Sequence, residues 1–322
     1  MASKTKYAIG FDLGGTKMIS AVVADGKILS RARAKTGAQH GPEEVLSKII
    51  SVIYESIEKA ELKKDDISGI CLAVPGPLDR DKGIMVYTPN LGFVDYPMKK
   101  NLEKVVGLPV LLENDVNAGT YGEYKQGSAK GYRHILSLFP GTGMGGAMIL
   151  DGRLYRGASG NAGEMGHIII DRSGPLCGCG NYGCLEAFSS RTGMAKEAVA
   201  SASAGKSPEV YKNAGSDFKN YKSRVFAEFY HSDDTIQKIV NRGAKYLGIG
   251  MANFVNIFNP EVIVLGGGVV EKLGRIYIEK AEKSMRKYAL QALSKDVTVV
   301  EAALGDDAVI LGAAHILFDE AV

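Results

Sequence analysis

The stretch IGFDLGGTKMISAVVADG, residues 9–26, and the stretch ILSLFPGTGMGGAMILDG, residues 135–152, decide the fold. Placed over one another without a gap, they agree at six of the twelve positions from residue 15 to residue 26. In each stretch, apolar residues flank a glycine-threonine turn and an Asp-Gly pair of the kind that closes tight hairpins. We therefore predict a duplicated unit of strand, turn, strand, hairpin and strand, against the alternative of two unrelated glycine hairpins.

A duplication of this kind predicts two related domains whose glycine turns face one another across a cleft. Such a cleft suits an extended polyphosphate. The two copies differ at Asp12, which aligns with Leu138, so only the first copy offers a carboxylate.

The rest of the chain alternates between helical and strand patterns, which predicts an α/β fold. We expect a small domain at 1–120, a large domain at 121–305 and a terminal helix at 306–322 that returns to the small domain. The polar segment 205–232 carries scattered aromatic residues, which indicates a helical insertion at the surface. The other expected helices cover 42–62, 186–204 and 233–258, and one more begins near residue 270. The other expected strands cover 67–74, 110–113, 261–265 and 297–300.

Composition excludes several classes of protein. With 322 residues, 45% hydrophobic and 23% charged, the chain is globular and long enough for two domains. A net charge of +3 favours neither nucleic acid nor an anionic membrane as a partner. The N-terminal apolar stretch is interrupted by Asp12, and no apolar run is long enough for a membrane span, so we expect a cytoplasmic protein.

The first glycine turn has the composition of a phosphate-binding turn, because glycines let successive backbone N–H groups face an anion. It is not a Walker A loop, since threonine precedes lysine and a strand follows. Asp12 is either a partner of Mg²⁺, through water, or an aspartate that caps the turn. The candidate nucleotide-binding residues here are Asp12, Gly14, Gly15, Thr16 and Lys17.

The second turn matches the pattern G-x-G-x-x-G, which alone would indicate a dinucleotide-binding fold. That fingerprint must open a helix, whereas residues 147–152 read as a strand and hairpin, so we reject this interpretation. We expect phosphate contacts from this turn, and the family resemblance described below implies an adenosine contact from the glycines after strand 261–265. The candidates are Gly141, Thr142, Gly143, Gly145, Gly266 and Gly267.

His167, Cys177, Cys179 and Cys184 offer one imidazole and three thiolates, which suffice for a closed tetrahedral Zn²⁺ site. A site with four protein ligands leaves no open position, so such a zinc would be structural. The alternative is a group of buried free thiols. Cys71 stands alone in an apolar strand and is interpreted as a core residue.

Asn114 and Asp115 follow a predicted strand directly, at the edge where α/β folds bind ligands. Asp115 is our candidate general base, and an Asx turn at the strand end is the competing interpretation. Glu164 and Glu186 bracket the metal segment and could accept hydrogen bonds from hydroxyl groups, or could simply be solvated.

Taken together, these motifs resemble the ROK family of bacterial sugar kinases and sugar-sensing repressors, within the actin-like ATPase (ribonuclease H-like) superfamily. The resemblance covers nearly the whole chain. It is carried by DLGGTK at 12–17, AVPGPLD at 73–79, ENDVNA at 113–118, GTGMGG at 141–146, and GNAGEMGH with CGCGNYGCLE between 160 and 186.

The resemblance implies two duplicated domains with a cleft between them, and it assigns roles to particular residues. Asp115 would be the catalytic base. His167 would hold zinc through one ring nitrogen and reach the sugar through the other. The implied sugar contacts are Gly76, Asn90, Asn114, Asp115, Glu164, His167 and Glu186.

We therefore expect an ATP-dependent hexose kinase that uses Mg²⁺ and a structural Zn²⁺ and makes glucose 6-phosphate. The alternatives are an N-acetylmannosamine or fructose kinase, and a non-catalytic sugar sensor. Repressor members carry a helix-turn-helix before the first turn, and here only six residues precede the first strand. Polyphosphate-using relatives often lack the cysteines, which favours ATP, and the family implies a homodimer or higher homo-oligomer.

Overall fold

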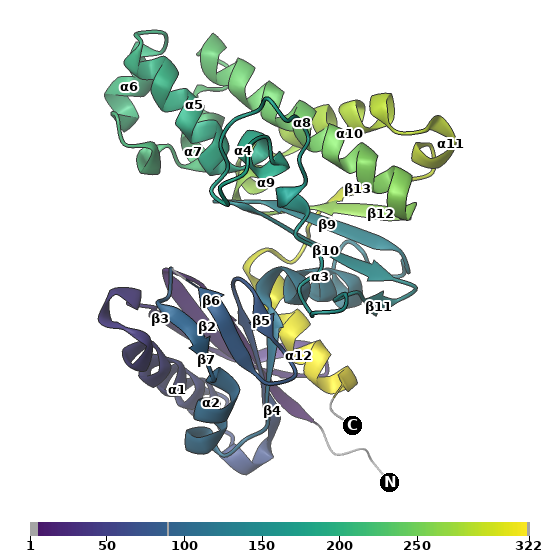
Figure 1. Cartoon of the computed structure of the whole chain (residues 1–322). Helices are drawn as coiled ribbons and strands as arrows, with labels where there is room; N and C mark the ends of the chain where they lie inside the picture. The colour runs from purple at the N-terminus through teal and green to yellow at the C-terminus, as the bar shows by residue number, and fades with distance from the viewer. Residues whose placement is uncertain (1–5, 89, 321–322) are drawn as a thin grey trace. The chain divides into compact units, whose positions relative to one another are not determined.

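The computed structural model describes residues 6–88 and 90–320, and the chain forms two compact units (Figure 1). The first unit holds residues up to 131, the segment 154–162 and the chain from 303 onward; the second holds 132–153 and 163–302. The expected boundary after residue 120 falls inside α3 (Asp115–Gln126), a continuous helix that cannot be divided between units. The return of 154–162 to the first unit was not expected from the sequence.

The first unit is built on a five-stranded sheet of order β3-β2-β1-β4-β8. The strands β1, β4 and β8 run parallel, whereas β2 pairs antiparallel with β1 on one side and with β3 on the other. Strand alternation places Ile9, Phe11 and Leu13 in one core and Ala8 in the core on the other side of the sheet. The strands are β1 (Tyr7–Leu13), β2 (Lys17–Ala24), β3 (Lys27–Lys35), β4 (Ile67–Val74) and β8 (Val110–Asn114).

Helices cover both faces of this sheet. Ile49 and Ile53 of α1 (Pro42–Lys59) are fully buried in the core that includes Phe11. On the other face, α12 (Ala308–Glu320) packs against β1 and β4, and its terminal location in the first unit agrees with the expected return of the last helix. The remaining long helix of this unit is α2 (Met98–Val106).

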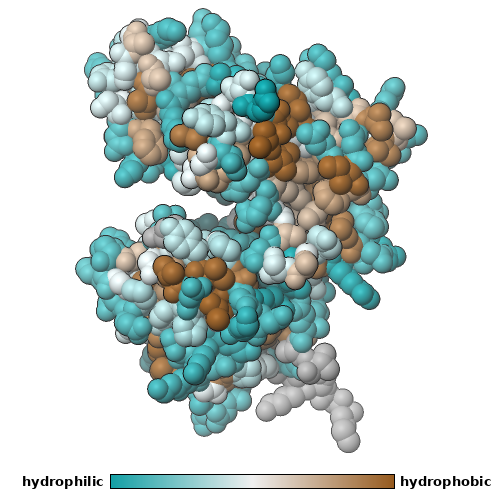
Figure 2. Space-filling view, viewed as in Figure 1, coloured by the Kyte–Doolittle hydropathy of each residue, from teal (hydrophilic) through white to brown (hydrophobic). Residues whose placement is uncertain are grey.

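A small antiparallel sheet in the first unit was not predicted. It comprises β5 (Leu78–Asp79), β6 (Ile84–Thr88) and β7 (Phe93–Tyr96). Figure 2 shows apolar surface over the region of β6 and β7, where the side chain of Val94 is 64% exposed. The strands of this small sheet are too short, and too rich in exposed residues, for alternation of apolar and polar residues to identify them in the sequence.

The second unit repeats the sheet of the first. Its strand order is β11-β10-β9-β12-β13, with β12 parallel to β9 and to β13. The Asp-Gly hairpins also match, since Asp25 and Asp151 have φ of 49° and 52°. The predicted duplication of the hairpin unit is therefore confirmed at the level of topology. The strands are β9 (Ile135–Pro140), β10 (Met144–Leu150), β11 (Arg153–Leu154), β12 (Val262–Leu265) and β13 (Thr298–Glu301).

The helices of the second unit follow the expected pattern with one correction. The helix expected over 186–204 is two helices, because the Ser190 hydroxyl accepts the Gly193 N–H and starts a new helix. The helix expected over 233–258 is confirmed, with Asp233 accepting N–H groups of Thr235 and Ile236 at 2.9 Å. The helices are α4 (Leu185–Ser189), α5 (Arg191–Ser203), α6 (Pro208–Ala214), α7 (Ser223–Phe229), α8 (Asp234–Phe258), α9 (Gly268–Leu273), α10 (Arg275–Tyr288) and α11 (Gln291–Ser294).

The segment 205–232 is helical, as expected, and has its own buried aromatic residues. Tyr221 and Phe226 are both fully buried. Within the described residues, no helix is long and apolar enough to cross a membrane. The short 3-10 helices are η1 (Ala38–His40), η2 (Lys64–Asp66), η3 (Met165–His167), η4 (Phe218–Asn220) and η5 (Gly305–Asp307).

Candidate active site and metal centre

In the first unit, the ends of three parallel strands bring the predicted residues to one edge of the sheet. Asp12 of β1 lies opposite Ala73 of β4, which in turn lies opposite Glu113 of β8. Because parallel strands end on the same side, the residues after them share that edge. The register thus places Asp12, the turn after β4 and Asn114 at a common edge.

The turn between β1 and β2 is closed by its own backbone and braced by Thr36, the residue after β3. The Gly14 N–H donates to the Lys17 carbonyl at 3.0 Å, and the Thr36 hydroxyl donates to the Gly14 carbonyl at 2.7 Å. A Cβ on Gly14 would stand 2.9 Å from the Lys17 carbonyl oxygen, so the turn requires glycine there. Gly15 and Thr16 are exposed, and their backbone can approach a ligand.

Asp12 is a mostly buried carboxylate with a perturbed pKa. Its pKa is raised from 3.8 to about 6 overall, because burial and the Asp306 carboxylate, which raise it, outweigh the Lys17 ammonium, which lowers it. A nearby cation would favour the ionised form of this group. The oxygen donor and its burial therefore fit the predicted role as a partner of hydrated Mg²⁺.

Asn114 and Asp115 form the start of α3. The Asn114 Oδ1 atom accepts the N–H groups of Val116 at 2.9 Å and Asn117 at 3.1 Å, so Asn114 is the N-cap. Its amide nitrogen is the group that can donate to a ligand. Asp115 is the first residue of the helix, where the helix dipole favours a carboxylate. The Asp115 Oδ1 atom also accepts the Val116 N–H, at 2.9 Å. The role of Asp115 as the base stays a prediction.

Two further predicted sugar contacts lie near these residues. Gly76 has φ of +83°, and a Cβ there would be 2.9 Å from the Tyr87 carbonyl oxygen, so only glycine fits this turn after β4. Asn90 is exposed, and its Cβ lies 3.9 Å from the position that a Cβ on Gly15 would take. Asn90 thus lies beside the first glycine turn.

In the second unit, the turn between β9 and β10 rests on the start of α5. The Gly141 N–H donates to the Gly143 carbonyl at 2.8 Å and closes the turn. The Arg191 N–H donates to the Gly141 carbonyl at 2.9 Å, and its guanidinium donates to the Thr142 hydroxyl at 3.1 Å. Since β10 begins at Met144, a strand follows the turn and the rejection of a dinucleotide-binding fold is confirmed.

The glycines after β12 lie at the same sheet edge as this turn. Gly267 has φ of +78°, and its Cβ would stand 3.0 Å from the Pro140 carbonyl oxygen. A Cβ on Gly266 would come within 2.6 Å of the Phe139 ring. Close packing against β9 therefore explains these glycines structurally, and the predicted adenosine contact stays a prediction.

Glu186, on α4, connects the second turn to the cysteine segment. Its Oε2 atom accepts the Met144 N–H at 2.8 Å, and its Oε1 atom lies 3.3 Å from the Cys177 sulfur. These contacts fix the carboxylate beside the turn. Its predicted contact with a sugar hydroxyl stays a prediction.

The structure brings the four predicted metal ligands together. The ligand atoms of His167, Cys177, Cys179 and Cys184 all lie within 4.8 Å of one another. The Cys179 and Cys184 sulfurs are 3.6 Å apart, and the Cys177 sulfur is 3.7 Å from His167 Nδ1. With Zn–S distances of about 2.3 Å, a tetrahedral site has ligand separations of this size. The donor set and spacing fit Zn²⁺.

Local turns set the spacing of the cysteines. The Gly180 N–H donates to the Cys177 carbonyl at 3.2 Å, and Gly180 has φ of +92°, which folds the chain back after Cys179. Burial raises the pKa of Cys177 to about 12, whereas the Asn181 N–H lowers that of Cys179 to about 7. A bound Zn²⁺ would lower these pKa values, because a thiol that coordinates a metal loses its proton.

The two ring nitrogens of His167 face different groups, and their predicted roles toward zinc and sugar stay predictions. Its Nδ1 atom faces the cysteines, and its Nε2 atom lies 3.9 Å from a Glu164 carboxylate oxygen. The Glu164 side chain is 62% exposed, and it precedes η3, which packs on β10. The Glu164 carboxylate and His167 Nε2 are thus adjacent, and both could form hydrogen bonds with the hydroxyl groups of a polyol.

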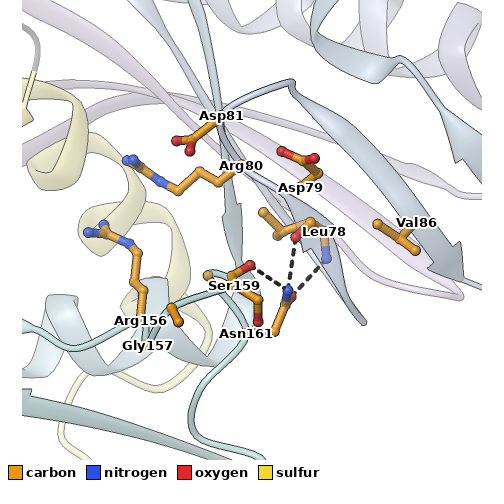
Figure 3. Close-up of a pocket in the computed structure, with 11 residues that line it drawn as sticks. Leu78, Asp79, Arg80, Asp81, Val86, Arg156, Gly157, Ser159 and Asn161 are labelled. Atoms are coloured by element: carbon orange, nitrogen blue, oxygen red, sulfur yellow. Dashed lines mark hydrogen bonds between the residues drawn. The ribbon is translucent and has the colours of Figure 1, made fainter.

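Sequence reasoning missed the arginines of the first unit that surround Glu113. Arg80 and Arg156 both line a pocket of about 510 Å³, with Asp79, Ser159 and Asn161 nearby (Figure 3). Burial lowers the pKa of the Arg156 guanidinium, but the Glu113 and Glu320 carboxylates outweigh it and raise that pKa overall. The one feature of the sequence that could have pointed to these arginines is Glu113, a charged residue at the end of an otherwise apolar strand.

Comparisons with known proteins find sugar kinases and a sugar-responsive repressor among the similar chains. The chain is 35% identical to a glucokinase of Thermotoga maritima over 96% of both chains, and 31% identical to the xylose repressor of Bacillus subtilis over 98% of this chain and 78% of the repressor. A ROK family glucokinase of Streptomyces griseus, solved with glucose and AMPPNP, superposes with a TM-score of 0.81 at 29% identity over 96% of this chain and 98% of that one.

The family profile extends over nearly the whole chain, from residue 8 to residue 320. Both units, with their repeated sheets, agree with the actin-like ATPase fold of such glucokinases. The chain therefore belongs to the ROK family.

Proposed function

We propose that this protein transfers the γ-phosphoryl group of ATP to the 6-hydroxyl of a hexose, and that the hexose is glucose. One observation carries this proposal: the register of β1, β4 and β8 aligns Asp12, Gly76 and Asn114–Asp115 at one sheet edge. The glucokinase relatives support the same reading.

In this proposal, Asp115 acts as the base. The sugar oxygen attacks the γ-phosphorus, its proton passes to the Asp115 carboxylate, the bond from the γ-phosphorus to the bridging oxygen breaks, and ADP leaves. The transition state is loose, so the proton can leave late and a weak base suffices. Catalysis is then mostly positioning and charge stabilisation.

This proposal assigns binding groups to residues in each unit separately. The backbone N–H groups of the glycine turns at 14–16 and at 141–143 would bind phosphate, and Asp12 would hold hydrated Mg²⁺. When bound, Mg²⁺ neutralises charge on the β- and γ-phosphates. The amide of Asn114, the carboxylates of Glu164 and Glu186, and His167 Nε2 bind sugar hydroxyls.

The Zn²⁺ that His167 and the three cysteines would hold is structural, because four protein ligands fill its coordination. With Nδ1 bound to the metal, His167 would keep one tautomer, and its Nε2 atom would be available to the sugar. Thiolate ligands suit the reducing cytoplasm, where we place the protein.

Product analysis tests this proposal. Incubation with ATP, Mg²⁺ and glucose should yield one equivalent of glucose 6-phosphate per ADP, identified by ³¹P NMR. A phosphate on another hydroxyl would refute the proposed geometry at Asp115. Tight sugar binding without any phosphorylated product would instead support the sensor alternative.

A further inference from the structure

Glu113 is a buried carboxylate two residues before the proposed base, and both of its carboxylate oxygens accept hydrogen bonds. It is 1% exposed, and a carboxylate so buried must be paired. Its Oε1 atom accepts the Asn114 N–H and the Asn117 side-chain amide, both at 2.9 Å. Its Oε2 atom accepts Arg156 Nε at 2.8 Å.

The Oε1 contacts enclose Asp115 between two fixed neighbours. Asn117 is 2% exposed, and its backbone N–H donates to Asn114 Oδ1. Asn114 and Asn117 are thus each bonded both to Glu113 and to one another. Because Asp115 lies between them in sequence, its backbone cannot rotate without breaking one of these hydrogen bonds.

The Oε2 contact attaches this arrangement to a second segment. Arg156 belongs to 154–162, which is part of the first unit although the chain on both sides of it belongs to the second. The other end of the segment is anchored by Asn161, whose side chain accepts the Leu78 N–H at 2.9 Å and donates to the Leu78 carbonyl at 3.1 Å (Figure 3). Glu164 and His167 follow Asn161 by three and six residues.

We propose that Glu113 and Arg156 form a positioning pair for phosphoryl transfer, which fixes Asp115 toward the sugar hydroxyl and ties it to the segment that leads to Glu164 and His167. This inference rests on the proposed kinase function. The pair touches no reacting atom, and it acts through Asn114, Asn117 and the backbone of Asp115.

The chain offers a matched control for Arg156. Arg80 has the same side-chain exposure, 20%, and both arginines pair with Glu320. They differ at Glu113, since Arg156 approaches Oε2 at 2.7 Å through its terminal nitrogen, whereas Arg80 Nε lies at 3.4 Å. Arg156→Ala and Arg80→Ala therefore remove similar side chains but unequal contacts with Glu113.

The first arm of the test measures kcat and divides the rate by the concentration of protein that binds glucose. Calorimetric titration with glucose gives that concentration. Arg156→Ala and Glu113→Gln should each lower kcat about tenfold or more, with the glucose Kd changed less than about threefold. Arg80→Ala should keep kcat within about threefold of wild type. A purely structural role would reduce the amount of active protein but leave kcat per active molecule unchanged, which would overturn the inference.

The second arm does not depend on activity. Amide hydrogen exchange in the peptide that covers 113–118 should accelerate in Arg156→Ala and not in Arg80→Ala. Equal exchange in both variants would overturn the inference even if the wild type is an active kinase. A wild type that phosphorylates no hexose would overturn the proposed function and the catalytic role of the pair, whatever the exchange result.

Discussion

At the scale of single residues, Asp12 has the pKa shift with the clearest consequence. Its pKa is raised from 3.8 to about 6 by burial, so the folded protein binds more protons than the unfolded chain between these values. The free energy of unfolding of the nucleotide-free protein should therefore fall as pH rises from about 4 to about 6, by at most about 3 kcal/mol. Urea unfolding across this range measures the effect.

Asp12→Asn should remove this pH dependence and make the nucleotide-free protein more stable than wild type at pH 7, while weakening binding of Mg²⁺ with AMPPNP. Asp25→Asn is the matched control, because Asp25 is exposed on the adjoining hairpin and asparagine tolerates its φ of 49°. An Asp12→Asn variant with the wild-type pH profile would show that another group titrates.

Asp115 gives a second prediction at this scale. Asp115→Asn should still bind glucose but lose at least about 10²-fold in kcat, since the amide cannot accept the proton. Initial rates with calorimetry of sugar binding separate the two effects. Asp65→Asn, at an exposed aspartate of η2, should behave as wild type. If Asp115→Asn kept the wild-type kcat, Asp115 would not be the catalytic base.

At the scale of elements, the cysteine segment should lose its order without metal. Cys179→Ser should lower the zinc content from one equivalent per chain. It should also raise the glucose KM roughly tenfold, because a misoriented His167 would lose one hydrogen bond to the sugar, which contributes about 1.5 kcal/mol. Elemental analysis and kinetics measure both quantities. Cys71→Ala, at a buried cysteine in β4, should keep its zinc. An unchanged glucose KM in zinc-free protein would show that the metal has no role in sugar binding.

The crossing of α3 and α12 depends on glycine. A Cβ on Gly312 would stand 1.7 Å from the Ala118 carbonyl oxygen, so the helix backbones touch. Gly312→Ala should destabilise the protein by about 1–3 kcal/mol or more, because the helices must separate. Gly268→Ala, which meets only Ser223 Oγ at 3.7 Å, should leave urea unfolding nearly unchanged. Equal effects of the two changes would contradict this packing.

How far the sequence predicts these elements depends on whether the decisive signal is local. The caps of α8, the strand after the second glycine turn and the metal ligands follow from spacing along the chain, and the structure agrees with each. The bracing of the first turn by Thr36, the contact of Arg191 with Thr142, and the Glu113–Arg156 pair join residues distant in sequence. No local pattern reports such pairs, so sequence reasoning did not find them.

At the scale of the whole molecule, the repeated sheet explains why two glycine turns occur in one chain. Each sheet places one turn at the carboxyl end of its first strand, and only the first copy has a carboxylate there, Asp12. The domain boundary was harder to predict, because the chain passes between the units four times and the segment 154–162 rejoins the first. A homodimer, implied by the family resemblance, stays a prediction for sedimentation analysis.

The central claim is that this chain is an ATP-dependent glucose kinase. The most direct test is a coupled ADP-release assay of the purified protein with ATP, Mg²⁺ and, in turn, glucose, mannose, fructose, N-acetylglucosamine and N-acetylmannosamine. We predict ADP release that depends on added sugar, with the highest kcat/KM for glucose. Glucose that binds in calorimetry but releases no ADP would contradict the account.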